Sequence, residues 1–434
     1  MFTTLKNAWK IPDLRKKILY TLLILFIVRV GSVIPVPFLD PSALKAMIGE
    51  SGNLLGFLDI MTGGAFASAT LFALSISPYI TSSIVMQLLT IAIPALERLA
   101  KEGEEGRKRI QVITRYATVA LSLIEATAYY FMFRNTAGAL AYRSGFEGVV
   151  AALAIIFCFT AGAMLVVWLG ERIDAKGIGN GISLILFTGI ISRGPQAVMT
   201  LVAYLELAVH GATAYFFFVP LVVIMFVLLI AFIVWMTNAE RRIPVQYAKR
   251  VVGRKMYGGN SSFFPIKVNM SGVLPIIFAS SFLAIPGTIK SFAYSSGPVD
   301  TLGYKILSLF DYNSWLYAVL YFVLIIAFNY FYVAIQYNPI EIANNLRKNS
   351  GMVPGIRPGK PTAEFISKTI GRITLVGALF LALIAILPIL VGAVAKMNIS
   401  LGGTSILILV GVALDTMRTL ESQMMMRHYK GFLE

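Results

Sequence analysis

The chain has 434 residues, of which 57% are hydrophobic and only 13% are charged. This composition excludes an ordinary soluble domain and is typical of a polytopic helical membrane protein. The formal net charge of +16 is compatible with binding of nucleic acid, with anionic lipid or with membrane topology, and its distribution along the chain must decide between them. The single cysteine, Cys158, excludes internal disulfides and cysteine metal clusters.

A membrane span needs about 20 mostly apolar residues. The first hydrophobic run, Ile18 to Ile34, has no signal-peptide cleavage site and is followed by Pro-Val-Pro, so we expect it to remain as the first span. The hydrophobic pattern predicts further spans along the rest of the chain. The predicted spans cover residues 18–36, 72–93, 113–133, 149–169, 182–203, 214–236, 271–290, 314–336, 369–391 and 400–417.

The stretch from Leu54 to Pro94 is too long for one span and is interrupted by charged, hydroxyl and glycine residues. Irregular backbone and hydroxyl groups at membrane depth are tolerated only where protein or a water-filled cavity satisfies them. The sequence therefore predicts a re-entrant segment at about 56–70, followed by a spanning helix at about 72–93. Because glycine weakens a helix by ~1 kcal/mol, we expect the pair Gly63-Gly64 to leave the segment loosely held.

Basic residues test the orientation of the spans, because cytoplasmic loops carry an excess of lysine and arginine. Most of the 37 lysines and arginines fall in the first turn of the chain and in alternate loops, for example Lys6, Arg107, Arg241, Arg357 and Arg427. With ten spans, this asymmetry places both termini on the cytoplasmic side.

Five predicted spans precede the break near His210 and five follow it, which divides the chain into halves at 1–210 and 211–434. An odd number of spans gives the halves opposite orientations, as in inverted-repeat transporters. The second span of each half is the interrupted one: Ser271 to Lys290 contains Pro275 and Pro286. Interrupted spans in corresponding positions indicate a functional site between the repeats.

Two loops on the cytoplasmic side, at about 239–270 and 337–368, are long enough to be functional or disordered. The first alternates apolar and basic residues between Arg241 and Lys267, which predicts a protruding hairpin. Such loops suit a large acidic partner, including RNA, whose phosphates bind lysine and arginine. The alternative, topology alone, explains the charge of the loops but not their length.

The sequence lacks several kinds of chemistry. Its two histidines, His210 and His428, lie outside the predicted spans, and no phosphate-binding loop of the GxxxxGK[ST] type occurs. The Gly177–Gly181 stretch, GIGNG, is interpreted as the turn that begins a helix. Charges within spans are few: Glu125 is a functional candidate, and Arg29 either snorkels or forms a structural pair. We therefore expect no enzyme activity and no cofactor or metal.

Five motifs resemble the SecY/Sec61-alpha family, whose bacterial member is the central subunit of the Sec protein-conducting channel. They are TLFALSISPYITSSIVMQLL at 70–89, GERIDAKGIGNGIS at 170–183, KVNMSGVLPIIFASS at 267–281, VPGIRPGKPTAEFI at 353–366 and LGGTSILILV at 401–410. The resemblance extends over nearly the whole chain, in order. One position departs from the family: Ser75 stands where the family commonly has glycine, which bears on the local helix packing.

The resemblance implies an all-α fold of ten spans in two inverted halves around a pore, with a re-entrant plug helix on the outer side. By motif, the waist of the pore is a ring of aliphatic residues: Ile76, Ile80, Leu186, Ile190, Ile277 and Ile408. Aliphatic side chains can close a pore to ions by dewetting. The plug at 56–70 includes Gly56, Phe57, Leu58, Asp59, Ile60, Met61, Gly63 and Gly64.

The resemblance also implies a lateral gate between the second and third spans on one side and the seventh and eighth on the other. Polar contacts across such a seam contribute about 0.6–2 kcal/mol. The expected gate residues are Thr81, Gln87, Glu125, Ser280 and Ser281, with Ile285 where some relatives place a polar residue. Contacts with the motor ATPase SecA or the ribosome, including ribosomal RNA, are expected at Arg250, Arg254, Lys255 and Arg357.

The leading hypothesis is a passive, gated channel that passes unfolded secretory polypeptides across the bacterial cytoplasmic membrane and releases apolar segments sideways into lipid. Its implied partners are SecE, SecG, SecA, the translating ribosome, signal-sequence-bearing precursors and membrane lipids. The alternative is an inverted-repeat secondary transporter for a small solute that uses Glu125. An intramembrane enzyme is disfavoured by the lack of histidines and paired acids.

Overall fold

The computed structural model describes residues 2–42, 59, 62–135, 138–210, 213–247, 250–252, 255–257, 261–293, 301–310, 314–395 and 403–430. Of the residues predicted to form the plug, Gly56, Phe57, Leu58, Ile60 and Met61 lie outside this set.

The fold is mostly helical, and the helices follow the two predicted halves of the chain. The first half contains α1 (Phe2–Lys10), α2 (Pro12–Gly31), α5 (Ser77–Ala92), α6 (Pro94–Lys101), α7 (Glu104–Asn135), α8 (Gly145–Lys176), α9 (Gly181–Ser192) and α10 (Gly194–Val209). The second half contains α11 (Tyr215–Asn238), α12 (Leu274–Ala293), α13 (Leu302–Ser308), α14 (Trp315–Gln336), α15 (Pro339–Lys348), α16 (Lys360–Ala395) and α17 (Gly403–Lys430).

Each predicted span coincides with a helix. Within the described ranges, six helical segments are long and apolar enough to cross a membrane, or seven when the bent pair α5 and α6 counts as one span. The chain is therefore a multi-pass membrane protein, while the count of ten spans stays a prediction.

Two helix boundaries differ from the prediction. Helix α5 begins at Ser77 rather than near residue 72, because Ser75 adopts a left-handed φ of 47° that does not continue a helix. The fifth span is divided at Arg193 into α9 and α10, where Gly194 and Pro195 follow. Prolines within α11, α12 and α16 are accommodated inside their helices.

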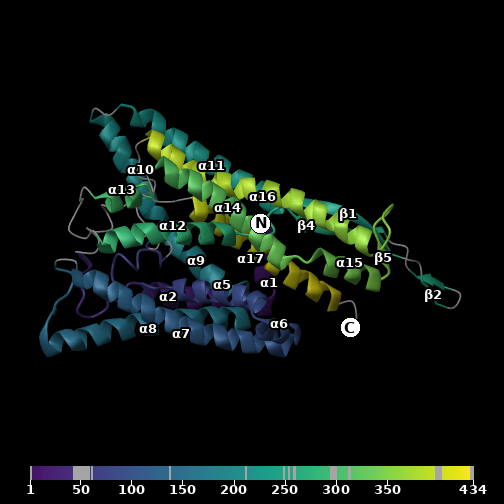
Figure 1. Ribbon diagram of the computed structural model, residues 1–434, viewed down its shortest axis with the longest axis horizontal. Coiled ribbons are helices and arrows are strands. Elements are labelled where there is room, and N and C mark those ends of the chain that lie inside the picture. The colour runs from purple at the N-terminus through teal and green to yellow at the C-terminus, as the bar shows by residue number, and fades with distance from the viewer. Residues whose placement is uncertain are drawn as a thin grey trace.

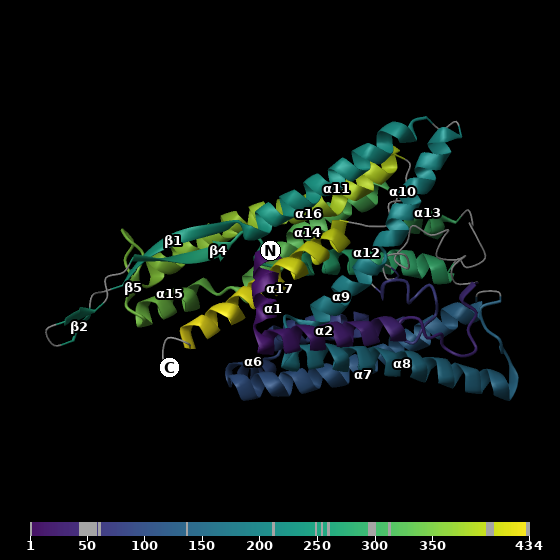
Figure 2. The same cartoon turned by 180° about the vertical axis from the view of Figure 1, so that it is seen from behind.

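The two halves form two groups of helices that lie side by side. In Figure 1, α2, α5, α7 and α8 lie along the lower side and α11, α14 and α16 along the upper side, with α9, α12 and α17 between them. The reverse view in Figure 2 has the same arrangement. The strands and α15 project beyond one end, here called the hairpin end, and α10 and α13 lie near the other.

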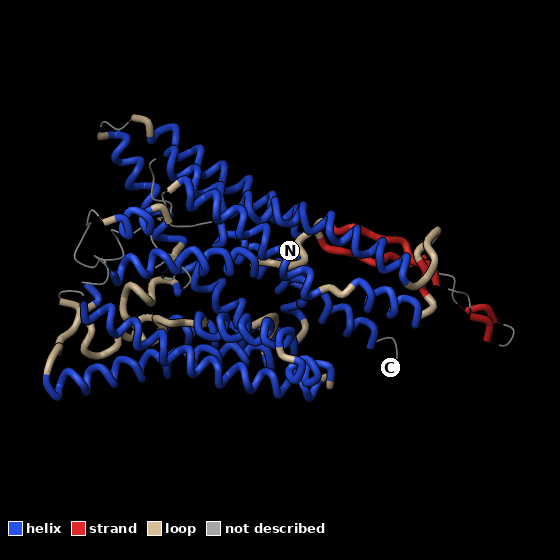
Figure 3. The backbone as a smooth tube through the Cα atoms, in the orientation of Figure 1, coloured by secondary structure: helices blue, strands red, loops and turns tan. Residues whose placement is uncertain are grey.

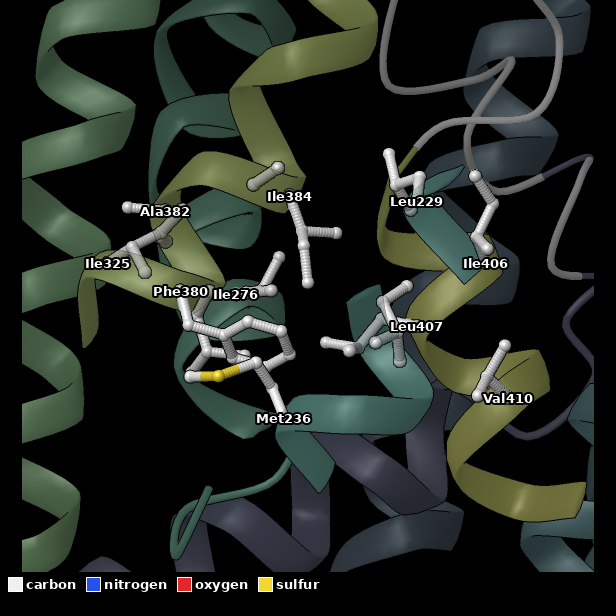
Figure 4. Close-up of a cluster of buried hydrophobic side chains, with 14 of the residues drawn as sticks. Leu229, Met236, Ile276, Ile325, Phe380, Ala382, Ile384, Ile406, Leu407 and Val410 are labelled. Atoms are coloured by element: carbon white, nitrogen blue, oxygen red, sulfur yellow. The ribbon is translucent and has the colours of Figure 1, made fainter. Parts of the chain in front are cut away.

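The largest apolar core belongs to the second half. It joins α11, α12, α14, α16 and α17, and Figure 4 shows Met236, Ile276, Ile325 and Phe380 around it. Ile276 and Ile325 are completely buried. Close packing between α16 and α17 requires Gly403, since a Cβ there would lie 1.9 Å from the Ile384 carbonyl oxygen.

The predicted hairpin is confirmed. Strands β1 (Glu240–Tyr247) and β4 (Ser261–Lys267) pair antiparallel, and β5 (Gly351–Met352) adds to the other edge of β1. Figure 3 shows this sheet beyond the helices. Short strands β2 (Arg250–Val252) and β3 (Lys255–Tyr257) form a separate pair at the tip. The sheet is anchored because Ile243 and Ile266 pack with Ile366 of α16.

Candidate pore and its re-entrant segment

The six residues predicted to form the pore ring come from four helices. Ile76 and Ile80 lie at the start of α5, Leu186 and Ile190 on α9, Ile277 on α12 and Ile408 on α17. Pairs spaced by four residues share one face of a helix. The position of α9 is fixed by its N-terminus: the Asn180 side chain accepts a hydrogen bond from the Ser183 amide, and Asp174 accepts one from the Gly181 amide. The GIGNG stretch is thus a helix-starting turn, as predicted.

Five of the six residues belong to one apolar cluster. Ile76, Leu186, Ile190 and Ile408 are buried in it, and Ile80 packs against it. Side chains of this kind offer no hydrogen-bond donor and no charge to a passing solute. Ile277 joins them through a shared cavity.

A cavity of about 600 Å³ extends from this cluster toward the hairpin end. Ile80, Leu186, Ile277 and Ile408 line one part of it. The other part is lined by residues of β4 and of the chain leading to α12, and by Asp415 and Arg418 of α17. The cavity therefore joins an aliphatic constriction to a polar mouth on the side of the basic loops.

The described part of the re-entrant segment, Thr62 to Ile76, consists of turns that are packed against the loop after α2. The amide of Val36 donates to the carbonyl of Ala69 at 2.9 Å, and the amide of Leu71 donates to that of Ile34 at 2.9 Å. Phe66 is buried among side chains of α7 and α8. The prediction of a loosely held segment is wrong for this part, because its backbone is paired and its apolar side chains are covered.

Close approach of α8 explains part of this packing. A Cβ on Gly162 would lie 1.9 Å from the Leu71 carbonyl oxygen, so only glycine lets α8 lie directly against the segment. The ring of Phe72 similarly occupies the space beside Gly31 of α2. The segment is thus held by backbone contact with α2 and α8 as well as by apolar burial.

Charged side chains surround the turn at Gly63-Gly64. Asp59 forms a salt bridge with Arg193, which lies between α9 and α10. Arg29 of α2 donates to the Gly63 carbonyl oxygen at 3.4 Å. Arg29 therefore takes the structural-pairing alternative rather than snorkelling. We call Arg29, Asp59 and Arg193 the charged corner.

The residues predicted for the lateral gate lie on the expected helices, but their hydroxyl groups bond locally. Thr81 of α5 donates to the Ser77 carbonyl at 3.1 Å, and Ser280 of α12 donates to the Ile277 carbonyl at 3.0 Å. Gln87 and Ser281 are exposed. Glu125 of α7 is half-buried, and among the described residues its Oε2 atom has no hydrogen-bond partner. Ile285 lies within α12, but its side chain is outside the described set.

A neutral polar clamp holds the chain just before α12. The Ser271 hydroxyl bonds to the Asn329 side-chain oxygen, and the Asn329 amide nitrogen donates to the Thr374 carbonyl at 3.0 Å. Asn329 lies on α14 and Thr374 on α16, and both are buried. This polar clamp of Ser271, Asn329 and Thr374 joins the start of α12 to two neighbouring helices.

The residues expected to contact SecA or the ribosome lie at the hairpin end. Arg250 begins β2 and Lys255 begins β3, whereas Arg254 lies outside the described residues. Arg357 lies between β5 and α16, where its carbonyl accepts a hydrogen bond from the Thr362 hydroxyl at 2.8 Å. Within the described ranges, no three His, Cys, Asp or Glu side chains could hold a metal ion together.

The sequence interpretation did not identify Arg193 or Asn329. Arg193 had a signal, because it is a lone basic residue beside a Gly-Pro break inside an apolar stretch. Asn329 likewise interrupts the apolar run of α14. Neither signal indicates the partner, which comes from a distant part of the chain.

An apolar constriction, a cavity on one side of it and a re-entrant segment among membrane helices define a gated membrane channel. The SecY family model matches residues 70–417. Curated relatives named protein translocase subunit SecY include those of Streptomyces galbus, at 43% identity with complete coverage of both chains, and Thermotoga maritima, at 40% identity covering 100% of this chain and 98% of the relative. The chain belongs to the SecY family.

Solved structures have the same fold at low sequence identity. One described as a protein conducting channel has a TM-score of 0.62 and 18% identity, covering 94% of this chain and 92% of that one. Sec61 in the canine ribosome-channel complex has a TM-score of 0.58 and 19% identity, with the same coverage. The protein is a protein-conducting channel, and the hypothesis of a small-solute transporter using Glu125 is not supported.

Proposed function

We propose that unfolded polypeptide crosses the membrane through the ring of Ile76, Ile80, Leu186, Ile190, Ile277 and Ile408. The observation that carries this proposal is the cavity of about 600 Å³ that ends on four of these residues. Aliphatic side chains bind no part of a passing chain strongly, yet pack closely enough to exclude water when the pore is empty. Relatives at about 40% identity over their whole length are named as translocase subunits, which supports the same role here.

The re-entrant segment is proposed to act as the plug that seals the outer side of the ring. Its described part is buried against α7 and α8, and Ile76 at its end belongs to the ring itself. A related solved structure concerns a SecY plug domain that stabilises the closed channel and maintains a membrane seal. Deleting 56–70 is expected to raise resting ion conductance and to relax the requirement for a signal sequence.

The lateral gate is proposed to lie between α5 and α7 on one side and α12 and α14 on the other. Helix α5 packs on α7 and α12 packs on α14, so each side can move as a unit. Thr81, Gln87, Glu125, Ser280, Ser281 and Ile285 are the proposed residues along this seam. Apolar segments would leave through it into lipid.

The chain carries no nucleotide-binding loop of the kind described above, so we propose that partners drive transport. The basic hairpin end, with Arg250, Arg254, Lys255 and Arg357, is the proposed contact for SecA, the ribosome or ribosomal RNA. Two of the related structures are ribosome-bound channels, which supports the ribosome as a partner. SecE and SecG are the proposed small subunits, and the cytoplasmic membrane, with both termini on the cytoplasmic side, is the proposed location.

A crosslinking experiment tests the pore. A secretory precursor carrying one cysteine is stalled in the channel, which bears Ile277→Cys in a Cys158→Ala background. A disulfide between precursor and channel is expected at this position. The control, Val227→Cys on the exposed face of α11, should give none. Crosslinks at Val227→Cys but at no ring position would contradict the proposal.

A further inference from the structure

The charged corner joins the re-entrant segment to two helices through groups that are mostly covered. The side chains of Asp59 and Arg193 are 6% and 17% exposed. Arg193 also donates to the Gln196 side chain, while among the described residues its Nε atom is buried without a hydrogen-bond partner. Two arginines thus lie beside a single carboxylate at membrane depth, where unbalanced charge is costly.

Asp59 also organises the turn of the segment. Its Oδ1 atom accepts a hydrogen bond from the Ala67 amide at 2.7 Å, and its carbonyl accepts one from the Gly64 amide at 2.9 Å. The other carboxylate oxygen, Oδ2, pairs with Arg193. One residue therefore both shapes the segment and attaches it to α9, so a shift of the segment must separate this ion pair.

The two glycines of the turn are where the two arginines lie. A Cβ on Gly63, with φ of 67°, would lie 2.5 Å from the Arg29 Nη1 atom and from the Ser192 hydroxyl. A Cβ on Gly64, with φ of 92°, would lie 3.3 Å from the Arg193 Cζ atom. The Gly63 carbonyl meanwhile lies 3.4 Å from both its donors, Arg29 and Ser192. The glycine pair is a contact surface for guanidinium groups.

We propose that Arg29, Asp59 and Arg193 form an ionic latch that sets how readily the channel opens. The inference rests on the proposed sealing role of the re-entrant segment. While the segment is seated, Asp59 neutralises an arginine that no water reaches. When the segment moves into a water-filled funnel, water hydrates the separated charges, so the latch can release without leaving a bare charge in the protein.

The latch predicts an unusual order among variants. Asp59→Asn keeps the Oδ1 acceptor for Ala67 but leaves both arginines without a counter-ion, so resting ion conductance should rise at least about tenfold. Arg193→Gln should raise it less, by roughly threefold, because Arg29 lies close enough to approach Asp59. The double variant Asp59→Asn/Arg193→Gln should leak less than Asp59→Asn alone, since removing both partners leaves one fewer unpaired charge.

The experiment measures resting conductance in planar bilayers, and transport of a precursor with a defective signal sequence, using the channel complex as it purifies from cells. Asp40→Asn is the matched control, because this exposed carboxylate bonds only to nearby Ser42 in the printed contacts and the same charge is lost. It should leave both readouts at the wild-type value. The charge exchange Asp59→Arg/Arg193→Asp should return conductance to within about threefold of wild type.

The outcomes separate the latch from the sealing role. If deletion of 56–70 leaks but Asp59→Asn does not, the latch is wrong and the sealing role stands. If the deletion itself leaves conductance unchanged in a channel that still translocates, both fail. Poor folding of Asp59→Asn is recognised by gel filtration, and the charge exchange then decides: a leak as large as that of Arg193→Gln or larger overturns the latch.

Discussion

The starts of α5 and α12 occupy corresponding places in the two halves, and polar groups hold both. Before α5 the contacts are ionic, between Asp59 and Arg193, with Arg29 on a backbone carbonyl. Before α12 they are neutral, from Ser271 through Asn329 to a carbonyl of α16. The same position in the inverted repeat is thus held by two different kinds of chemistry.

The difference separates a part that is built to move from a part that is built to stay. Charges that separate into a water-filled funnel are hydrated, so the cost of opening is moderate. Asn329 is 2% exposed within a helix bundle, where no water can replace its partners. We therefore expect the segment before α5 to leave its seat during transport and the start of α12 to move only together with α14 and α16.

The largest expected effect lies in the ring between these two regions. Ile190→Asp places a charge at a side chain that is 1% exposed, which prevents dewetting of the constriction, so resting conductance should rise at least about tenfold. Ile190→Leu conserves volume and should stay within about twofold of wild type. Planar-bilayer recording measures both. Equal conductance in the Asp and Leu variants would show that the ring does not seal the pore.

The next effect sharpens the ionic side of the comparison. Gly63→Ala forces a side chain into a left-handed φ and against Arg29, so the free energy of unfolding should fall by roughly 2–4 kcal/mol, and the leak should increase. Gly145→Ala is the matched control: its φ is 80°, but nothing lies within 4 Å of the new Cβ. Thermal unfolding in detergent compares them. Identical losses would mean that backbone strain alone, and not the arginine contact, matters.

On the neutral side, Asn329→Ala leaves the Ser271 hydroxyl without its partner in a buried site. The free energy of unfolding should fall by about 1–3 kcal/mol, while resting conductance stays within twofold of wild type. Thermal unfolding and bilayer recording on the same preparation test this. A leak comparable to that of Asp59→Asn would break the distinction between the two starts.

The smallest effect concerns the backbone just before α5. Ser75 has a φ of 47°, which costs a residue with a Cβ about 1–2 kcal/mol, and glycine returns part of this as unfolded-state entropy. Ser75→Gly should therefore raise the free energy of unfolding by about 0.5–1 kcal/mol. Ser77→Gly, inside the first turn of α5, should lower it. A loss of stability in Ser75→Gly would contradict the backbone explanation.

Much of the fold follows from hydrophobic patterning. Every predicted span is occupied by a helix, and alternation of apolar and basic residues predicted the pair β1 and β4. The sequence could not predict where α5 begins, because that boundary depends on a left-handed residue, Ser75, whose conformation is imposed by packing. The departure from the family glycine did point to this position.

The site was predicted unevenly, for a physical reason. The ring residues come from motifs that resemble a family, and five of the six pack in one cluster. The charged corner depends on a pairing between Asp59 and Arg193, which no local pattern encodes because the two residues meet only after the helices assemble. Gly63-Gly64 suggested looseness for the same reason: glycine also permits close contact, and only the fold decides between the two.

One measurement tests directly whether the start of α5 must move while the start of α12 need not. In a Cys158→Ala background, Gly63→Cys/Ser192→Cys and Ser271→Cys/Asn329→Cys each place two sulfurs in contact range, as the present contacts indicate. Oxidation of the first pair should stop precursor translocation and reduction should restore it, whereas the second pair should transport in both states. Transport through the oxidised Gly63/Ser192 pair would contradict the account.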